Sequence, residues 1–387
     1  MPYPPYRGDK LKIYNLARRL CVRHELYLLT FAQTAEDWSY VAELKKIFKE
    51  VHLVALPKWR SALNTLAATA GSEPFQVHYF RAAEMRQQLD ALLSAHSFDA
   101  VHVQHLRMAQ YLRDHKELPR ILDLPDAFSL YWKRKQDRPG NPLLKLFERE
   151  EQRRVWRYEQ VIRDYNMGLV CSEEDKEYLE QEHGLSNVRI LPNGVDTDTY
   201  AARQHDYSHH HTLLFTGNMD YRPNVDAVTY FCKEILPLVS ARVPGVRFVI
   251  AGQRPVASVK ALAGEQVQVT GFVKDLATVY DSASVVVAPL RFGAGTQNKV
   301  LEAMAMGVPV VCSHIGFRGL GIRSGEGAIM QTDPVAFARS IIDLLQSAQL
   351  RQDTGMAGAE VIRSRFSWDI IASQLEAYLE QVARGRV

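Results

Sequence analysis

The sequence predicts an α/β fold with two Rossmann-like, doubly wound domains. Short apolar strands alternate with longer helical stretches along the whole chain, which is typical of parallel sheets covered by helices on both faces. The strands are too many for one compact sheet. The 387 residues also exceed what a single hydrophobic core usually supports. We therefore expect two domains of this kind.

The first half supplies the strands of the first domain. Apolar runs predict them at Leu26–Phe31, Val51–Leu56, Ala100–His105, Ile121–Leu124, Met167–Cys171 and Val188–Leu191, with helices at Asp9–Val22 and Ala42–Glu50. A doubly wound domain usually opens with a strand whose carboxyl end delivers the first ligand loop. Pro2–Lys10 looks like that loop, and no strand precedes it in the sequence. We expect the first domain to lack its first strand.

The second half repeats the rhythm, with strands predicted at Leu213–Gly217, Val246–Ala251, Val267–Thr270, Val285–Pro289 and Val308–Cys312. A polar, unpatterned stretch follows the turn Pro192-Asn193-Gly194 and indicates a linker. The predicted organisation is an N-terminal domain at 1–196, a linker at 197–211, a C-terminal domain at 212–366 and a C-terminal helix within 367–387. We expect this amphipathic helix to pack back on the first domain.

The composition is that of an ordinary globular protein, with 47% hydrophobic and 24% charged residues and a net charge of +3. No dense basic tract indicates nucleic-acid binding. The four cysteines are scattered without a CxxC pair, which favours reduced thiols and a cytoplasmic protein. There is no apolar run of transmembrane length and no signal-peptide core. The adjacent His209, His210 and His211 cannot readily converge on one metal ion, and they are expected in the linker.

The stretch Arg291–His314 carries the clearest functional signal. Gly293 and Gly295 allow the backbone to approach a ligand closely, because they have no Cβ. A helix is expected to open near Thr296–Gln297, with its free N–H groups and positive dipole end at the glycine loop. Such a helix start binds phosphate or diphosphate.

Lys299 and Glu302 are three residues apart and therefore share one face of that helix. Glu302 lies in an otherwise apolar run, where a carboxylate without a partner is costly. A ribose next to a bound diphosphate would supply the partner. The alternative is an ordinary strand-to-helix turn in which Glu302 forms a structural ion pair.

Seven segments carry a resemblance to a known family. They are PYPPYRGDKLKIYNLARRL, FDAVHVQHLRMAQYL, LVCSEEDKEYL, LPNGVDTDTY, LLFTGNMDYRPNVDAVTYF, VTGFVKDLATVYDSASVVVAPL and GAGTQNKVLEAMAMGVPVV. In this order and spacing the chain resembles the family 4 glycosyltransferases of the GT-B fold. More narrowly, it is similar to the sugar transferases associated with exosortase and exopolysaccharide loci.

The resemblance implies a nucleotide-sugar in the second domain, an acceptor in the first, and an active site in the cleft between them. Helix termini and basic side chains would neutralise the leaving diphosphate without a metal. The implied donor-binding positions are Gly8, Gly217, Asn218, Arg222, Phe272, Val273, Gly293, Ala294, Gly295, Thr296, Asn298, Lys299 and Glu302. Glu302 matches the second glutamate of the family's paired-glutamate motif. The first glutamate of that pair falls on Ala294, which leaves the sugar specificity open.

On the acceptor side the resemblance implies roles for Asp9, Lys10, Gln104, Asp126 and Ser129. The family's cleft histidine aligns on Gln104, with His105 beside it, and His102 and His105 both lie at a strand end. We expect His105, Lys299 and Glu302 to be the catalytic set. The alternative for His102, His105 and the polar residues after Ile121–Leu124 is a purely structural role.

The segment 131–165 combines ten cations with six aromatic residues. It could rest on anionic lipid and so bring the enzyme to a lipid-linked acceptor. The alternative is a long solvated helix, because Glu148, Glu150, Glu151 and Glu159 offset much of the charge.

The resulting hypothesis is a glycosyltransferase of hexosyl type that uses a nucleotide-diphosphate sugar in exopolysaccharide or cell-surface glycan synthesis. The resemblance implies retention of anomeric configuration. Two close carboxylates for a double displacement are not evident. A front-face transfer, in which the leaving phosphate takes the acceptor proton, suits these residues better. The second hypothesis is a GT-B protein that binds nucleotide but has lost turnover. A nicotinamide-dependent oxidoreductase is excluded, because the chain has no early GxGxxG followed by an acidic residue.

Overall fold

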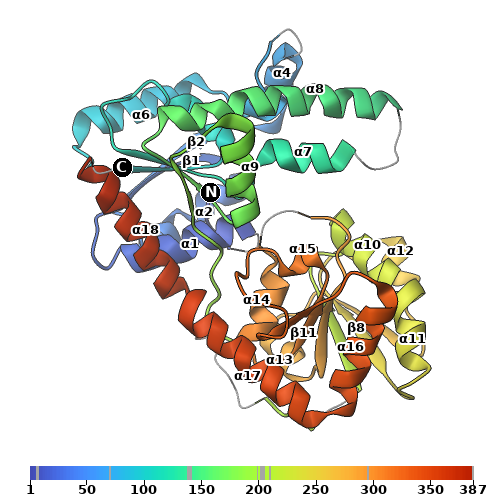
Figure 1. Cartoon of the computed structure of the whole chain (residues 1–387). Coiled ribbons are helices and arrows are strands. Elements are labelled where there is room, and N and C mark those ends of the chain that lie inside the picture. Colours follow the sequence, from blue (N-terminus) through green and yellow to red (C-terminus); the bar gives the residue numbers. More distant parts are fainter. Residues whose placement is uncertain are drawn as a thin grey trace. The chain divides into compact units, whose positions relative to one another are not determined.

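The computed structural model describes residues 1–5, 8–68, 71–136, 142–197, 199–200, 205–208, 211–293 and 296–385. The chain forms two compact units (Figure 1). Unit 1 comprises Met1–Pro192 and Ile371–Val387, and unit 2 comprises Asn193–Ile370. Both units contain parallel strands with helices between them, so the predicted fold class is confirmed.

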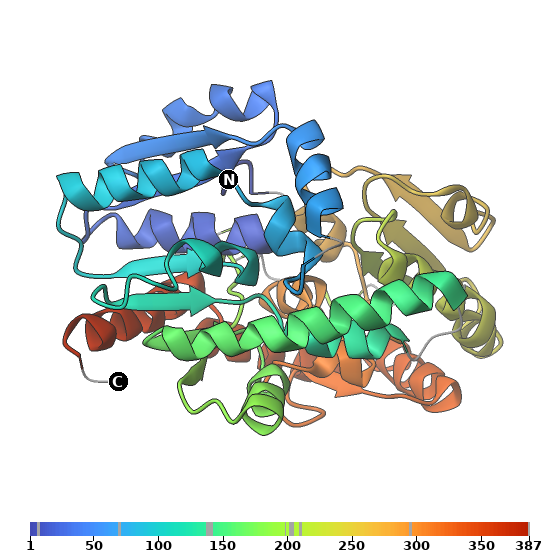
Figure 2. The same ribbon diagram turned by 90° about the horizontal axis from the view of Figure 1, so that it is seen from above.

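The strands of unit 1 are β1 Tyr27–Ala32, β2 Glu50–Ala55, β3 Val101–Gln104, β4 Arg120–Asp123, β5 Met167–Val170 and β6 Val188–Ile190. Its α-helices are α1 Gly8–Leu20, α2 Ala35–Ser39, α3 Val41–Leu44, α4 Lys58–Ala67, α5 Phe75–Tyr79, α6 Ala83–Ala95, α7 Phe128–Gln136, α8 Pro142–Glu159 and α9 Glu173–His183. Two 3₁₀ segments, η2 Leu106–Tyr111 and η3 Gln160–Asp164, complete the unit. The long green helix in Figure 2 is α8.

The described strands of unit 1 form two parallel sheets, one of order β1-β2 and one of order β3-β4-β5-β6. In the smaller sheet Tyr27 lies opposite Glu50, and in the larger one Val101 lies opposite Arg120. Phe31 and Val54 of the smaller sheet share one hydrophobic core with residues of the larger sheet.

The strands of unit 2 are β7 Thr212–Thr216, β8 Arg247–Ala251, β9 Val267–Gly271, β10 Val285–Ala288, β11 Val310–Cys312 and β12 Ala328–Met330. Its helices are α10 Arg222–Tyr230, the π-helical η4 Phe231–Ile235, α11 Leu236–Ser240, α12 Ala257–Lys260, α13 Leu276–Asp281, α14 Asn298–Ala305, α15 His314–Phe317, α16 Pro334–Gln346, α17 Ala348–Arg365 and the start of α18 Trp368–Ala383.

Unit 2 is a three-layer sandwich around one parallel sheet of order β12-β11-β10-β7-β8-β9. Alternate residues of a strand point to opposite faces. Phe215 therefore packs with α10 and α16 on one face, while Leu214 packs with α13 and α14 on the other. Buried strands of this kind carry apolar residues at every position, as the sequence VVVA of β10 does.

Three predicted elements differ from the structure. The helix predicted at Ala42–Glu50 is wrong beyond Leu44, because the N–H of Lys49 bonds to the carbonyl of Leu26 at 2.7 Å and draws the chain into β2. The sequence patterns did not predict β12. The described part of the expected linker belongs to unit 2, because Tyr207 donates to the carbonyl of Gly307 and accepts from Arg351 through its own carbonyl.

From Ile371 onwards α18 belongs to unit 1. Gln374 and Tyr378 both donate to the carbonyl of Ile190, at 3.1 and 3.2 Å. Glu376 pairs with Arg23 and with His24, at 2.6 Å from the ring nitrogen of His24.

Candidate functional site

The carboxyl ends of β7 and β8 in unit 2 approach each other through two glycines. Gly217 directly follows β7 and has φ +150, and its N–H donates to the carbonyl of Ala251 at 3.0 Å. A Cβ on Gly252 would lie 1.6 Å from the carbonyl oxygen of Gly217, so that position accepts only glycine. The backbones of the two loops therefore lie in direct contact at Gly217 and Gly252, and we call this surface the floor of the site.

A hydrogen-bonded cluster of side-chain amides packs on this floor. Asn224 of α10 donates to the carbonyl of Asn218 at 3.0 Å, and Gln253 donates to the Asn218 side chain at 2.9 Å. The remaining oxygen of Asn224, Oδ1, accepts from Nζ of Lys299 at 3.1 Å. The amides thus position the lysine that the sequence singled out.

Lys299 is a buried cation in the first turn of α14. Its ammonium group lies 5.0 Å from the centre of the Phe215 ring and contacts one amide oxygen. Burial lowers the pKa of Lys299 to about 8, although the charge of Glu302 opposes this shift. A buried ammonium group with one hydrogen-bond acceptor is incompletely neutralised, and binding an anion beside it is therefore favourable.

Glu302 lies one turn after Lys299 and accepts from the hydroxyl of Tyr280 through Oε2 at 2.8 Å. The Tyr280 hydroxyl also lies 2.6 Å from Oγ1 of Thr216, at the end of β7. Burial raises the pKa of Glu302, while the Tyr280 hydrogen bond and the charge of Lys299 act against that shift. The partner of Glu302 within the protein is therefore the hydroxyl of Tyr280. The structural ion pair that the sequence offered as an alternative is not formed at contact distance.

The helix α14 starts at Asn298, within two residues of the start that the sequence predicts. Gly293 has φ +156, Thr296 is buried, and Oδ1 of Asn298 accepts from Asn193 at 3.3 Å. Gln297, at the N-cap, makes no capping hydrogen bond with its side chain. The first backbone N–H groups of α14 therefore receive no hydrogen bond acceptor from that side chain. Ala294 and Gly295 lie outside the described residues.

The other predicted donor-side residues have varied settings. Arg222 is the exposed first residue of α10. Phe272 is 73% exposed after Gly271, and Val273 packs against the core. Two further arginines lie on this part of unit 2: Arg254 pairs with Asp220 at 3.4 Å, and Arg291 pairs with Asp226.

In unit 1 a buried ion pair joins the start of the chain to the carboxyl end of β4. Lys12 of α1 donates to Oδ1 of Asp123 and to the carbonyl of Leu191, both at 2.9 Å. Burial alone would raise the pKa of Asp123, but Lys12 and His102 outweigh it and lower the pKa to about 2. His102 lies 3.1 Å from Oδ2 and completes the cluster. His102 therefore has the structural role that the sequence offered as its alternative, as a partner of Asp123.

His105 follows Gln104, the last residue of β3, and has φ +75. A non-glycine residue in this region is strained, and such residues gather at functional sites. Its N–H donates to the carbonyl of Asp123 at 2.8 Å, which ties the strained turn to the buried ion pair. Gly8 and Asp9 open α1, and Lys10 follows them in its first turn.

Asp126 and Ser129 have opposite environments. Oδ1 of Asp126 is buried without a hydrogen-bond partner, and burial, with the charge of Asp175, raises the pKa of Asp126 to about 7. The acceptor-side prediction for Ser129 is wrong. Its side chain is completely buried, where it donates to Glu159 and lies 3.2 Å from the Tyr178 hydroxyl.

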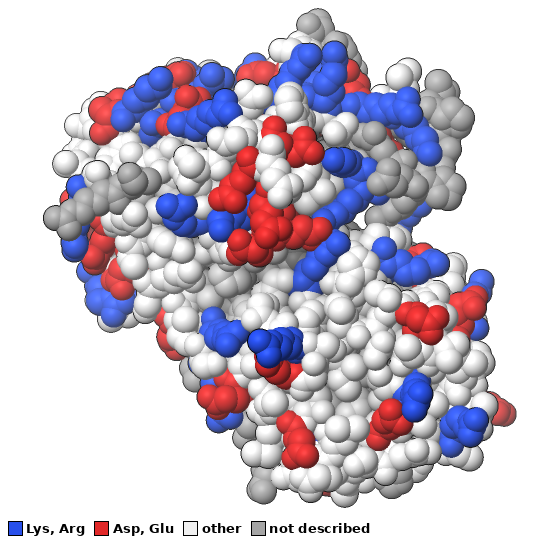
Figure 3. Space-filling view, in the orientation of Figure 1, with Lys and Arg blue, Asp and Glu red and all other residues white. Residues whose placement is uncertain are grey.

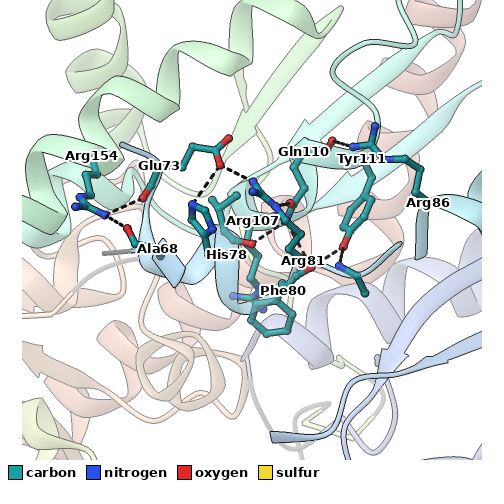
Figure 4. Close-up of polar contacts among 12 residues, drawn as sticks. Ala68, Glu73, His78, Phe80, Arg81, Arg86, Arg107, Gln110, Tyr111 and Arg154 are labelled. Carbon is teal, nitrogen blue, oxygen red and sulfur yellow. Dashed lines mark hydrogen bonds and ion pairs between the residues drawn. The ribbon is translucent and has the colours of Figure 1, made fainter. Parts of the chain in front are cut away.

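A cavity of about 570 Å³ opens beside η2, the segment that follows β3 and His105. Figure 4 shows Arg81 between Glu73 and Gln110, with Tyr111 and Arg86 on the opposite side. Gln110 is buried and donates to the carbonyl of Val77 at 2.9 Å, which fixes this side chain in the cavity wall. Its lining contains guanidinium groups, carboxylates and an amide, which is the chemistry that recognises sugar hydroxyls.

Most described cations of the segment 131–165 have acidic partners. Lys133 pairs with Glu182, Arg134 with Glu174, Lys135 with Glu148, and Arg153 and Arg154 with Glu150. Glu151 accepts from the N–H of Phe75, and Glu159 is buried. Arg138 lies outside the described residues. Figure 3 shows Lys and Arg gathered over α8 and α4, and Asp and Glu gathered over α9.

Sequence reasoning missed three of these residues. Lys12 belongs to the conspicuous RGDKLK stretch, but only the structure shows that it reaches Asp123. Asn224 and Tyr280 lie in helices without an unusual local pattern. Their contacts with Lys299 and Glu302 join parts of the chain 75 and 22 residues apart.

Residues 210–347 match the family described as glycosyl transferases group 1. Unit 2 therefore carries a group 1 glycosyltransferase domain. A curated relative, the phosphatidyl-myo-inositol mannosyltransferase of Mycobacterium tuberculosis, is 33% identical over 212 residues. That match covers 51% of this chain and 55% of the relative, so the chain spans about half the length of the curated relatives it matches.

Two solved structures share the fold of this protein over nearly the whole chain. Anabaena HepE in complex with UDP and glucose superposes with a TM-score of 0.66 at 15% identity, covering 97% of this chain and 96% of HepE. Sucrose-phosphate synthase from Thermosynechococcus elongatus gives 0.62 at 15% identity, covering 93% and 100%. The two Rossmann-like units are thus of the GT-B type.

Among the described residues, no helix combines the length and the apolar character that spanning a bilayer requires. Within the same ranges, no group of three His, Cys, Asp or Glu side chains is arranged to hold a metal ion.

Proposed function

We propose that this protein is a retaining glycosyltransferase of hexosyl type that uses a nucleotide-diphosphate sugar. The observation that carries the proposal is that Lys299 and Glu302 lie one turn apart on one face of α14, in the stretch that matches group 1 glycosyl transferases. Lys299 is a buried cation suited to a diphosphate, and Glu302 is a carboxylate suited to ribose hydroxyls. HepE, which shares the fold, is described in complex with UDP and glucose.

The donor site needs a group that neutralises the leaving diphosphate. The start of α14, the glycine loop at Gly293 and the ammonium of Lys299 supply positive potential at one place in unit 2. A front-face transfer then requires no base from the protein, because the leaving phosphate takes the proton of the acceptor hydroxyl. We expect the reaction to proceed without an added metal ion, which transfer assays with a chelator will test.

The acceptor is proposed to bind at the carboxyl end of β3 and β4 in unit 1. Ligands of open parallel sheets bind at this edge, and here it carries the strained His105, the half-buried Asp126 with its buried Oδ1, and the cavity beside η2. Gln104, Asp9 and Lys10 remain acceptor-side candidates from the resemblance. Gly8 remains a proposed donor contact on the same ground. Of the proposed catalytic set, His105 is the member in unit 1.

The proposed acceptor is a glycan or lipid-linked glycan of exopolysaccharide or cell-surface synthesis. The sequence motifs support this role, and one relative is named as a mannosyltransferase of phosphatidyl-myo-inositol, a lipid. We place the protein in the cytoplasm, at the inner face of the membrane. The paired charges of α8 weaken the case for contact through 131–165 alone.

An exposed apolar stripe on α4 adds a surface for that contact. Trp59, Leu63 and Leu66 are 67%, 56% and 67% exposed and recur at helical spacing on one face. Leu146 and Phe147 of α8 are exposed as well. The stripe fits the apolar part of a lipid surface, and Lys58 beside it fits anionic headgroups.

The second candidate is a GT-B protein that binds nucleotide without turnover. It is favoured by Ala294, which stands where the resemblance expects the first glutamate of the motif. The test compares thermal shifts with a panel of nucleoside diphosphates, for the wild type and Glu302→Ala, and then assays transfer from the matching nucleotide sugars. A ligand at a hundred times its Kd stabilises the folded state by about 2.7 kcal/mol. Stabilisation without hydrolysis or transfer would support the second candidate, and no stabilisation would refute both.

A further inference from the structure

Three side chains from separate elements of unit 2 form a buried hydrogen-bonded chain that ends at Glu302. Oγ1 of Thr216, the last residue of β7, lies 2.6 Å from the hydroxyl of Tyr280 on α13. That hydroxyl donates to Oε2 of Glu302 on α14 at 2.8 Å. It also lies 3.5 Å from the carbonyl of Lys299, which is the limit for a hydrogen bond.

The direction of each hydrogen bond follows from the chemistry of the groups. A tyrosine has one hydroxyl proton, and an ionised carboxylate only accepts. The proton of Tyr280 therefore serves Glu302, and Thr216 donates its own proton to the oxygen of Tyr280. Tyr280 is completely buried and Thr216 is 2% exposed, so water does not compete for either bond. Burial raises the pKa of Tyr280 well above its usual value, which keeps the hydroxyl proton in place.

This arrangement distinguishes the two oxygens of Glu302. Oε2 accepts from Tyr280, while Oε1 accepts no hydrogen bond from the residues that the structure describes. A free glutamate side chain populates many rotamers, and fixing it costs conformational entropy when a ligand binds. The chain of hydrogen bonds removes that cost beforehand, so one oxygen is ready for a hydroxyl group.

We propose that Tyr280 is the positioning residue that fixes Glu302 to accept from a ribose hydroxyl of the nucleotide. The inference rests on the proposed function, since it assumes that the site binds a nucleoside diphosphate. It adds that the preference for ribose over a deoxygenated sugar depends on Tyr280 as well as on Glu302. Tyr280 contacts no ligand in this scheme, because it acts through the carboxylate.

The test measures Kd by calorimetry for the nucleoside diphosphate that the wild type selects from UDP, GDP and ADP, and for its 2′,3′-dideoxy form. Loss of a hydrogen bond to a charged group costs the wild type about tenfold or more in affinity for the dideoxy form. Tyr280→Phe removes only the hydroxyl. We expect it to bind the ribo form about tenfold more weakly and the dideoxy form within twofold of the wild type.

Two further variants make the result specific. Thr216→Val removes the donor to Tyr280 and is expected to give a smaller loss, confined to the ribo form. Tyr207→Phe removes another tyrosine hydroxyl bond of unit 2, to the carbonyl of Gly307 beyond the far end of α14. It should leave both affinities unchanged.

The proposal is overturned if Tyr280→Phe weakens both forms equally, which indicates general damage to the site, or weakens neither. A wild type that binds none of the three diphosphates refutes the proposed function itself, and the role of Tyr280 falls with it. The two failures are therefore distinguishable from the wild-type titrations alone.

Discussion

Nζ of Lys12 lies 2.9 Å from Oδ1 of Asp123, across 111 residues of sequence, and both side chains are at most 3% exposed. The pair holds the start of α1 against the carboxyl end of β4. Asp123 also accepts from His102, and its carbonyl accepts from the N–H of His105. One buried contact thus supports the strained turn that we assign to the acceptor side.

Lys12→Met tests this support through stability. The substitution leaves the Asp123 carboxylate buried with His102 as its remaining side-chain partner, and breaking a buried ion pair costs about 3–5 kcal/mol. We expect a clear fall in Tm in thermal denaturation. Lys12→Met with Asp123→Asn should recover part of the loss, because the uncompensated charge is gone. Lys46→Met, which breaks an exposed pair with Glu43, should change Tm little; a similar fall for both lysines would contradict the prediction.

Gly252→Ala tests the close approach of the loops after β7 and β8. The new Cβ would meet the carbonyl oxygen of Gly217 at 1.6 Å, so the floor of the donor site has to shift. We expect a loss of more than about 2 kcal/mol in the free energy of unfolding. Gly264→Ala is the matched control, because its Cβ would meet nothing within 4 Å. Equal denaturation midpoints for the two variants would show that the loops are not so tightly joined.

Asp126→Asn tests the pH dependence of stability. The pKa of Asp126 is about 7 in the folded protein, above the ordinary 3.8, so the folded state binds more protons than the unfolded chain between these values. The stability of the wild type therefore falls as pH rises through this range, whereas asparagine stays neutral. Between pH 5 and pH 8 the free energy of unfolding of the variant should rise relative to that of the wild type by on the order of 2 kcal/mol. This is less than the full shift implies, because the side chain is only partly buried. A constant difference in Tm across this range would argue against an Asp126 that stays protonated in the folded protein.

The local patterns in the sequence predicted the helices and strands well where contacts between neighbouring residues of one segment determine its secondary structure. Nearly all strands and the glycine loop with its helix lie within a few residues of their predicted places. The prediction failed where distant contacts decide. The bond between Lys49 and Leu26 turns the end of a predicted helix into β2, and Glu159 holds Ser129 in the core. Tyr280 could not be linked to Glu302, because periodicity does not show which helices become neighbours.

The stripe on α4 gives a prediction about lipid. Sedimentation with phosphatidylglycerol vesicles should recover the wild-type protein at low salt, while phosphatidylcholine vesicles should recover much less. A variant with Trp59, Leu63 and Leu66 changed to serine should lose most of the binding, because the apolar contact is gone. A variant with Lys133 and Lys135 changed to serine alters cations that already have acidic partners, and it should bind nearly as the wild type does. Wild-type binding that does not depend on α4 would refute this surface.

Lys299 predicts how donor affinity depends on pH. A diphosphate binds the protonated ammonium, and the pKa of Lys299 without ligand is about 8. Below that value the lysine is already charged and affinity should change little. Above it each further pH unit lowers the protonated fraction of the free protein about tenfold, so Kd for a nucleoside diphosphate should rise about tenfold per unit. Lys299→Arg keeps its charge and should bind independently of pH up to 10, whereas Lys299→Met should bind weakly throughout. A wild-type Kd that stays flat from pH 7 to pH 10 would mean that Lys299 does not pair with the diphosphate, and the donor site would then have to draw its positive potential from the start of α14.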